Sequence, residues 1–251
     1  MPTSIEVDDL KDVEQKYVKE VYDVIAAHFA STRTKGPWAP VKAYLNKLPD
    51  HSVVLDVGCG NGKYFLVNPR LFMAGLDQSA ELAKIAVKSG NPLGLTVGNA
   101  TALPFSSSAF DHVLSIAVLH HLSDPATRAT MLGELIRVTR PGGTVFVSVW
   151  STNAPSAGKR KGPGQEPGQD RLVPWHLQKK FTDDDKVAKA QTPHDNTGDT
   201  RNLEVFYRYY HFFREGELEE AVRDAAETCG REVSVEVSSD KGNWYAEITV
   251  H

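Results

Sequence analysis

The sequence predicts an α/β fold with a mostly parallel, seven-stranded sheet, helices on both faces and an antiparallel hairpin near the carboxyl terminus. Three observations lead to this expectation. Strand-like apolar runs alternate with helix-like runs between residues 52 and 150, as they do in parallel sheets with crossover helices. The first of these runs leads directly into a glycine-rich turn at residues 58–62. Residues 240–242 are Asp-Lys-Gly between two alternating runs, which indicates a hairpin turn.

The elements up to residue 150 follow one another with short breaks. Residues 7–30 carry apolar side chains at helical spacing, so we expect a helix that ends before the Lys-Gly-Pro break at 35–37. Further helices are expected at residues 80–88 and 127–138. A Pro-Gly-Gly turn at 141–143 then separates the last helix from the strand after it. Strands are predicted to end near Asp56, Asp77, Gly98, Ser115 and Trp150.

The composition changes after Ala154. Residues 155–200 are rich in Gly, Pro, Lys and other polar residues, so we expect a mobile polar insertion there, with an apolar anchor at 172–175. The remaining pattern predicts a strand at 206–213, a helix at 215–228 and the two hairpin strands.

Length and composition exclude several classes of protein. At 251 residues the chain can bury one sizeable core, so we expect a single domain over residues 1–251 with a helical extension at 1–48. The longest apolar run, residues 113–119, is too short to cross a bilayer, and the start has no apolar leader, so we expect a soluble intracellular protein. Cys59 and Cys229 suggest neither a metal cluster nor a disulfide framework.

The net charge of −4 opposes attraction to nucleic acid by the chain as a whole. Any RNA contact must therefore come from a local basic patch. Such a patch is formed in the sequence by Lys159, Arg160 and Lys161, with Arg171, Lys179 and Lys180 further along. The alternative is a solvated loop without a partner.

The glycine-rich turn carries the strongest functional signal. Glycine allows a positive φ and lets a ligand approach the main chain closely. Gly58, Gly60 and Gly62 alternate, and Lys63 stands where a dinucleotide-binding fingerprint has its third glycine. A nicotinamide cofactor is therefore not favoured. Asp56 directly precedes the turn, and the alternative to a cofactor site is an ordinary strand-to-helix turn.

Two further strand ends place polar groups at the same edge of the sheet. Asp77 ends the next strand about 20 residues after the turn, where a carboxylate can accept from both ribose hydroxyls of a nucleoside. Asn99 follows the third strand, and its amide can accept from an adenine amino group and donate to a ring nitrogen.

Together these motifs resemble the S-adenosylmethionine-dependent methyltransferases of the Rossmann-like class. That class usually has an acidic residue at the position of Asn99, so the sequence departs from its pattern there. The resemblance implies S-adenosylmethionine as the cofactor. It implies cofactor contacts from Asp56, Gly58, Gly60, Gly62, Asp77, Gln78, Asn99, Ala100 and Ala117.

Other segments resemble a narrower family, the eukaryotic tRNA methyltransferases that esterify carboxymethyluridine at the wobble position, of the AlkB-homologue methyltransferase-domain type. The matching segments are residues 21–29, 31–33 with Trp38, 115–121, 173–175, 207–211 and 214–218. The resemblance implies a tRNA anticodon loop as the substrate. It also implies a heterodimer with a small zinc-binding activator subunit, which would dock by strand addition on the edge strand at 93–97. A cytoplasmic location, with the nucleus as a second compartment, is expected.

The implied acceptor is a carboxylate with a pKa of about 4, so it is already an anionic nucleophile at neutral pH. No general base is required, and alignment is expected to supply on the order of 7–11 kcal/mol of the barrier reduction. Arg33 and Arg208 are the candidates for gripping the carboxylate, because guanidinium offers paired donors. The alternatives are a surface ion pair for Arg33 and phosphate binding for Arg208.

Histidine and aromatic side chains complete the set of candidate catalytic residues. His120 and His121 follow the fourth strand, where ligands of parallel sheets bind. We favour His120 for contact with the uracil or the carboxylate, while its neighbour caps a helix or packs against the sheet. Trp150 is the best candidate for stacking on an anticodon base, with core packing as the alternative. His211 is a further candidate whose role is ambiguous.

Two other functions remain open at this point. A methyltransferase for a small molecule, such as a quinone precursor, would share the glycine turn and Asp77. A catalytically silent scaffold with a cofactor fold is the second alternative, because Asn99 departs from the class pattern.

Overall fold

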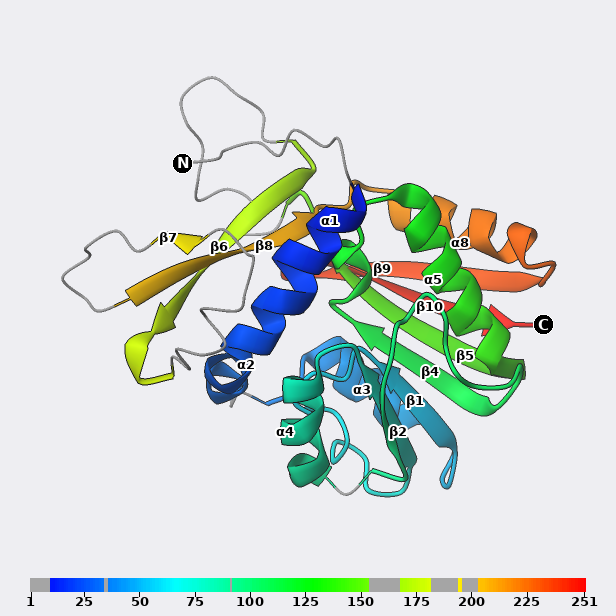
Figure 1. Ribbon diagram of the computed structural model, residues 1–251. Coiled ribbons are helices and arrows are strands. Elements are labelled where there is room, and N and C mark those ends of the chain that lie inside the picture. Colours follow the sequence, from blue (N-terminus) through cyan, green and yellow to red (C-terminus); the bar gives the residue numbers. More distant parts are fainter. Residues whose placement is uncertain (1–9, 34–35, 91, 154–167, 182–193, 196–202) are drawn as a thin grey trace.

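The main sheet confirms the predicted fold class. A computed structural model of the protein describes residues 10–33, 36–90, 92–153, 168–181, 194–195 and 203–251. In the order in which they lie side by side (Figure 1), the seven strands are β3 (Leu95–Val97), β2 (Phe72–Asp77), β1 (Val53–Val57), β4 (Phe110–Ile116), β5 (Thr139–Trp150), β10 (Asn243–Val250) and β9 (Val233–Asp240). The first five are parallel to one another, and β10 runs antiparallel to both of its neighbours.

Strand β5 begins earlier than the sequence predicts. Thr139 already pairs with Phe110, and the ladder resumes at Thr144 after an irregularity. The Pro-Gly-Gly segment therefore lies inside the strand as a bulge. A Cβ on Gly143 would lie 2.2 Å from the carbonyl oxygen of Asp111, so only glycine lets the two backbones approach at this point.

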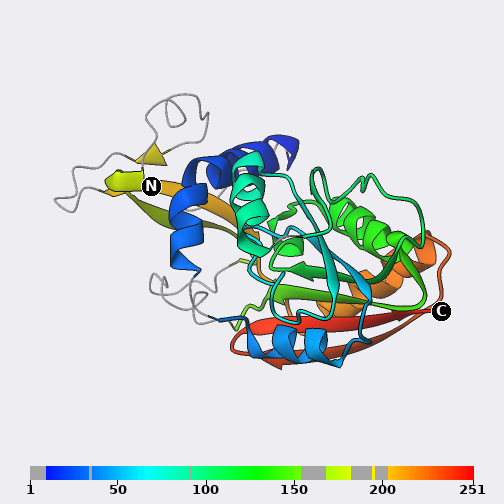
Figure 2. The ribbon, with the colours of Figure 1, turned by 90° about the horizontal axis from the view of Figure 1, so that it is seen from below.

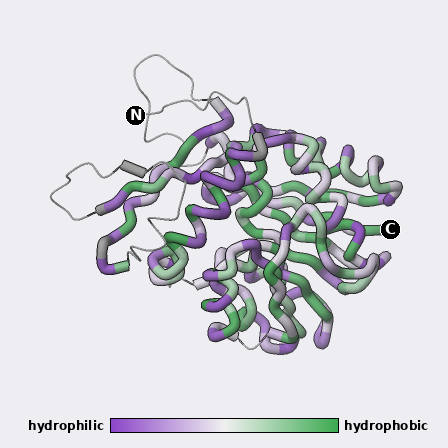
Figure 3. The backbone as a smooth tube through the Cα atoms, in the orientation of Figure 1, coloured by the Kyte–Doolittle hydropathy of each residue, from purple (hydrophilic) through white to green (hydrophobic). Residues whose placement is uncertain are grey.

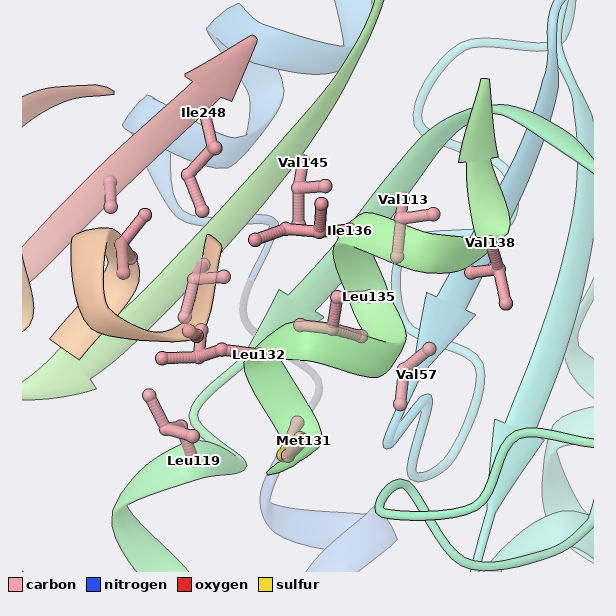
Figure 4. Packing of buried hydrophobic residues seen from close by; sticks show 14 of the residues in the cluster. Val57, Val113, Leu119, Met131, Leu132, Leu135, Ile136, Val138, Val145 and Ile248 are labelled. Carbon is pink, nitrogen blue, oxygen red and sulfur yellow. The ribbon is translucent and has the colours of Figure 1, made fainter. Parts of the chain in front are cut away.

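Helices cover both faces of the sheet. On one face, α5 (Pro125–Val138) and α8 (Glu217–Thr228) bury their apolar sides against β4, β5 and β10, as Figure 4 shows for Leu132, Leu135 and Ile136 of α5. On the other face lies α3 (Ala39–Lys47), whose Val41 and Leu45 are fully buried (Figure 2). A further helix, α4 (Ala80–Gly90), follows strand β2 along the chain. Figure 3 shows the hydrophobic segments concentrated along the strands between these layers.

The amino-terminal helix ends at Thr32, two residues beyond the expected end, and contains a π-helical turn. Helix α1 (Leu10–Glu14), the π-helical turn (Gln15–Lys19) and α2 (Glu20–Thr32) follow one another without a break. This helical rod lies between the main sheet and a second, smaller sheet (Figure 1). No helix in the described part of the chain has the length and apolar character needed to cross a membrane.

The smaller sheet was not expected from the sequence. It has three antiparallel strands in the order β6 (Asp170–Gln178), β8 (Leu203–His211) and β7 (His194–Asp195). Strand β6 contains the apolar anchor inside the segment 155–200, where a polar insertion was predicted, and Pro174 pairs with Tyr207 on its edge. The basic tripeptide Lys159-Arg160-Lys161 and the rest of residues 154–167 lie outside the described residues.

Candidate active site

A cavity of about 430 Å³ lies between the glycine turn and helix α2, at the carboxyl ends of β1, β2 and β4. Its walls fall into two halves. The half beside the glycine turn includes Gly58, Gly60, Asn61, Asp77, Gln78, Asn99, Ala100 and Ala117. The other half includes Tyr22, Phe29, Arg33, His120, His121, Trp150 and Tyr210. The structure thus brings together most of the residues that were singled out from the sequence.

The three glycines of the turn have different surroundings. Gly58 has a φ of +76°, and a Cβ there would lie 2.2 Å from Cγ2 of Val118. Gly60 has a φ of +56° and lines the cavity, and a Cβ there would meet only Cε1 of Phe29, at the ordinary contact distance of 3.9 Å. Gly62 has a φ of +75° and packs against Phe65, and it is not among the residues that line the cavity. Of the three glycines, the first two line the cavity and the third does not.

Asp56, near the end of β1, is a buried carboxylate. It is 1% exposed, and among the residues that the structure describes neither of its oxygens has a hydrogen-bond partner. Burial, with the charge of Asp77 added, raises the pKa of Asp56 to about 8. Asp56 lies behind the turn and does not line the cavity. An unpaired carboxylate at this depth is costly, and a cationic ligand nearby lowers that cost.

Asp77, at the end of β2, connects the turn to the helices around it. Its Oδ2 accepts from the backbone N–H of Gly60 at 2.7 Å, and its Oδ1 accepts from that of Ser79 at 2.9 Å. Burial raises the pKa of Asp77 to about 6, although both N–H bonds oppose the shift. The Ser79 hydroxyl donates to Asp23 of α2 at 2.5 Å. Each carboxylate oxygen of Asp77 keeps capacity to accept from a ligand hydroxyl.

Residues beyond β3 and β4 complete the cofactor half. The Asn99 side chain is exposed, and its Oδ1 accepts from the backbone N–H of Thr101 at 3.0 Å. Ala117 has a φ of +62°, a conformation that costs energy for a residue with a Cβ. Its N–H donates to the carbonyl oxygen of Ser148 at 3.0 Å, which holds the strained residue at the cavity wall.

Both histidines line the cavity, and the hydrogen bonds of each indicate its tautomer. The Nδ1 atom of His120 accepts from the backbone N–H of Trp150 at 3.0 Å. The Nδ1 of His121 faces the Tyr209 carbonyl oxygen at 2.8 Å and therefore carries the proton. Burial holds the pKa of His120 well below its usual value and lowers that of His121 to about 3. Both rings are therefore neutral at physiological pH.

An aromatic stack forms part of the same wall. The rings of Trp150 and Tyr210 lie 4.2 Å apart at an interplanar angle of 8°, so Tyr210 covers one face of the tryptophan. A base can then stack only on the other face. Tyr209, by contrast, is buried among Val13 and Val18 of the amino-terminal helix and belongs to the core.

Two guanidinium groups lie near this wall. Arg33 lines the cavity and sits over the ring of Phe29 at 4.3 Å, whereas Arg208 lies behind Tyr22 and Tyr210 over the ring of Trp175 at 4.8 Å. Within the part of the chain that the structure describes, neither group forms an ion pair with a carboxylate. Arg33, which lines the cavity, is therefore available to an anionic ligand.

His211 lies outside the cavity. Its Nδ1 contacts Asp170 at 2.8 Å and its Nε2 contacts Glu217 at 2.6 Å, so the ring connects β8 to β6 and α8. Burial opposes its charge, but the two carboxylates raise its pKa above the usual value. These contacts give His211 a structural role, and the catalytic role suggested by the sequence has no support in its position.

Comparisons with known proteins agree with this geometry. Residues 55–147 match the family described as "Methyltransferase domain". The tRNA (carboxymethyluridine(34)-5-O)-methyltransferase of Schizosaccharomyces pombe is 38% identical over 234 residues, which cover 93% of this chain and 96% of that protein. The enzyme of the same name from Saccharomyces cerevisiae is 32% identical over 281 residues, or 96% and 98% of the two chains. The chain belongs to this tRNA methyltransferase family.

The fold of this family member is Rossmann-like, as predicted. The solved complex between the Haloferax volcanii Trm112 methyltransferase activator and a methyltransferase matches it with a TM-score of 0.60 at 18% identity, over 92% of this chain and 96% of that chain.

Two cavity residues of the present chain, Tyr22 and Tyr210, have no individual signal in the sequence, because aromatic residues in a helix or strand are most often core. Only the structure shows that both line the cavity.

Proposed function

We propose that the protein transfers the methyl group of S-adenosylmethionine to the carboxylate of 5-carboxymethyluridine at the tRNA wobble position, giving the methyl ester. The observation that carries this assignment is one cavity whose lining holds both a carboxylate and a guanidinium. Asp77 lines the cavity, with Asp56 behind the glycine turn, and Arg33 lines it at the carboxyl end of helix α2. A cationic donor and an anionic acceptor therefore each meet the complementary charge.

The residues of the first half fit the cofactor. The backbone at Gly60 is open to a ligand, Asp77 can accept from ribose hydroxyls, and Asn99 can bind an adenine edge. The unpaired carboxylate of Asp56 suits the positive charge of a sulfonium. The cofactor, when bound, supplies an electrophilic methyl group.

The second half requires no proton transfer. An ionised carboxylate attacks without a general base. His120 and His121 are neutral, and their Nδ1 atoms are engaged by the backbone of Trp150 and Tyr209, which suits positioning rather than proton removal. Because both reactant charges diminish during transfer, strong stabilisation of the reactants alone would slow the reaction, and the enzyme gains chiefly from alignment.

Arg33 and Arg208 hold the acceptor in this scheme. Arg33 reaches the cavity directly. Arg208 is 5% exposed, and its charge acts on the acceptor at the wall formed by Tyr22 and Tyr210. In a site from which water is excluded, a nearby guanidinium interacts strongly with a carboxylate.

The assignment is tested with defined anticodon stem-loops and radiolabelled S-adenosylmethionine, with and without an activator subunit. The loops carry uridine, carboxymethyluridine or its methyl ester at the wobble position. We expect label to enter only the carboxymethyl loop, as a base-labile ester. Labelling of the uridine loop, or transfer to quinone precursors in place of RNA, would contradict the assignment.

A partner subunit is the second part of the proposal. Strand β3 lies at the edge of the main sheet, and Leu93 and Val97 beside and within it are 63% and 56% exposed. Leu66 and Phe72 are further exposed apolar side chains. We infer that a small zinc-binding activator adds a strand to this edge, as in β-augmentation. The structural match to a methyltransferase from a Trm112 complex supports this choice.

Charged substitutions test this interface. Leu93→Lys and Val97→Lys should abolish co-purification with the activator. Ser238→Lys, an exposed position on β9 at the opposite edge of the sheet, serves as the matched control. Co-purification that survives both the Leu93 and the Val97 substitution would place the partner elsewhere.

A further inference from the structure

The guanidinium of Arg208 has a restricted set of neighbours. It is buried among the rings of Trp175, Tyr210 and Tyr22, at 4.8, 5.2 and 6.0 Å from their centroids. Within the described ranges its Nε has no hydrogen-bond partner, and its Nη1 donates to the Tyr22 hydroxyl at 3.4 Å. Ring faces attract a cation but leave it free to turn in their plane. Among the described residues, the Tyr22 oxygen is thus the polar atom that can define the orientation of the guanidinium.

Tyr22 can hold Arg208 only if its oxygen acts as an acceptor, and His121 ensures this. The Tyr209 carbonyl can only accept, so the proton of neutral His121 stays on Nδ1. The Nε2 atom is then an acceptor, and the Tyr22 O–H donates to it at 3.0 Å. The lone pairs of the Tyr22 oxygen therefore remain available to Arg208 and to the Tyr210 hydroxyl, 3.5 Å away.

The three groups come from separate elements. Tyr22 lies on α2, one turn after the π-helical turn, His121 lies on the short helical turn Leu119–His121 after β4, and Arg208 lies on β8. A chain of hydrogen bonds through three elements is rigid only when each member is fixed by its neighbour. Here each bond has one allowed direction, which satisfies that condition.

We propose that Tyr22 and His121 are positioning residues that fix the guanidinium of Arg208 directly behind the cavity wall formed by Tyr22 and Tyr210, from where its charge selects an acceptor with a carboxylate. This inference rests on the proposed function. It predicts that removing the Tyr22 oxygen weakens recognition of the carboxylate specifically, because Arg208 keeps its charge but loses its orientation.

The test measures binding of stem-loops with carboxymethyluridine or uridine at the wobble position, to full-length protein with its activator and S-adenosylhomocysteine to prevent turnover. The readout is the ratio of the two affinities. Tyr22→Phe should lower this ratio about tenfold, the scale of one charged hydrogen bond, without changing cofactor affinity. Tyr44→Phe, which removes a buried hydroxyl bonded to Thr144 on the far side of the sheet, is the matched control and should leave the ratio unchanged.

Two further comparisons separate positioning from a general structural effect. In an Arg208→Gln background, Tyr22→Phe should lower the ratio no further, because the group it positions is gone. His121→Gln keeps an acceptor for Tyr22, whereas His121→Asn keeps only the bond to Tyr209. The glutamine variant should therefore retain a stronger preference for the carboxymethyluridine loop than the asparagine variant.

The outcomes are distinguishable from failure of the proposed function. If the wild-type protein shows no preference for the carboxymethyl loop, the proposed function itself is wrong. If the wild type shows the preference and Tyr22→Phe keeps it, or weakens both loops equally, the positioning role is overturned. The positioning role is overturned as well if Tyr22→Phe lowers the affinity ratio in the Arg208→Gln background by as much as it does in the wild type.

Discussion

Asp56 and Asp77 end neighbouring parallel strands, and the negative charge of Asp77 adds to burial in raising the pKa of Asp56 to about 8. The two carboxylates lie on one side of the cavity region, and within the described residues neither oxygen of Asp56 has a partner. Such a pair is unfavourable when both members are ionised, and a cation between or beside them relieves the repulsion.

The first prediction concerns the pH dependence of cofactor binding. Asp77, with a pKa of about 6, and Asp56, with a pKa of about 8, are protonated at low pH and ionise in turn as the pH rises. Affinity for S-adenosylmethionine should therefore increase from pH 6 to pH 8, by up to about tenfold per pH unit. Calorimetric titration measures this. S-Adenosylhomocysteine lacks the sulfonium charge and should give a shallower slope, and so should Asp56→Asn. Equal slopes for both ligands would refute the charge argument.

The second prediction concerns Asp77 itself. Asp77→Ala removes the acceptor of the Gly60 N–H and the proposed partner of the ribose hydroxyls, so cofactor binding should become undetectable by calorimetry. Asp77→Asn keeps an acceptor oxygen and should retain weak binding, with an affinity reduced by about 10- to 100-fold. Asp50→Asn, at an exposed ion pair with Arg70, is the control. Wild-type affinity in the alanine variant would remove Asp77 from the site.

The third prediction uses three glycines with positive φ. Gly142→Ala meets no atom within 4 Å, so only backbone strain of about 1 kcal/mol is expected. Gly58→Ala adds a clash with Val118 at 2.2 Å and should lower the free energy of unfolding by several times that amount, about 3 kcal/mol. Gly60→Ala should cost about as much stability as Gly142→Ala, because its Cβ meets only Phe29 at 3.9 Å, but it should impair cofactor binding because Gly60 lines the cavity. Urea unfolding measures the stability effects and calorimetry measures cofactor affinity. Equal cofactor affinity in the Gly60 and Gly142 variants would contradict the proposed approach of the cofactor to the Gly60 backbone.

The fourth prediction concerns His211. Its pKa is raised in the folded protein, so the stability it contributes is fully present below pH 6.5 and is lost as the pH rises through the higher folded value. His211→Gln should lower the free energy of unfolding by about 1–2 kcal/mol below pH 6.5 and by less at pH 8. Cofactor affinity should not change. A catalytic role would instead appear as lost turnover with normal stability.

The fold followed from the sequence wherever local signals agree with the long-range pairing. Buried strands that end in Asp56 and Asp77, with glycines after the first, have few alternatives in a chain of this length. Strand β6 was not predicted because it has few apolar residues, which are interrupted by Pro174 and surrounded by polar sequence. The strand is held by its partner β8, and no local pattern reveals such a pairing.

The candidate site was predictable where a motif has a chemical reason and not where a position depends on packing. The glycine turn, Asp77 and Arg33 were assigned to the cavity from their residue types and places. The sequence does not show that Gly60 lines the cavity while Gly62 does not, or that Asp56 lies behind the turn. These positions depend on φ angles and packing neighbours. The same holds for His121, whose two ring nitrogens are engaged by residues about 90 to 100 positions away.

The contact between Ser79 and Asp23 gives helix α2 a part in both halves of the cavity. Through Asp23 the helix holds the serine that bonds to Asp77, and through Tyr22 and Arg33 it faces the acceptor. We therefore expect the methyl donor and the RNA to contact the same helix. Occupancy by one reduces the conformational entropy that the other has to remove, so the two ligands should bind with positive cooperativity, each raising the affinity of the other by the same factor.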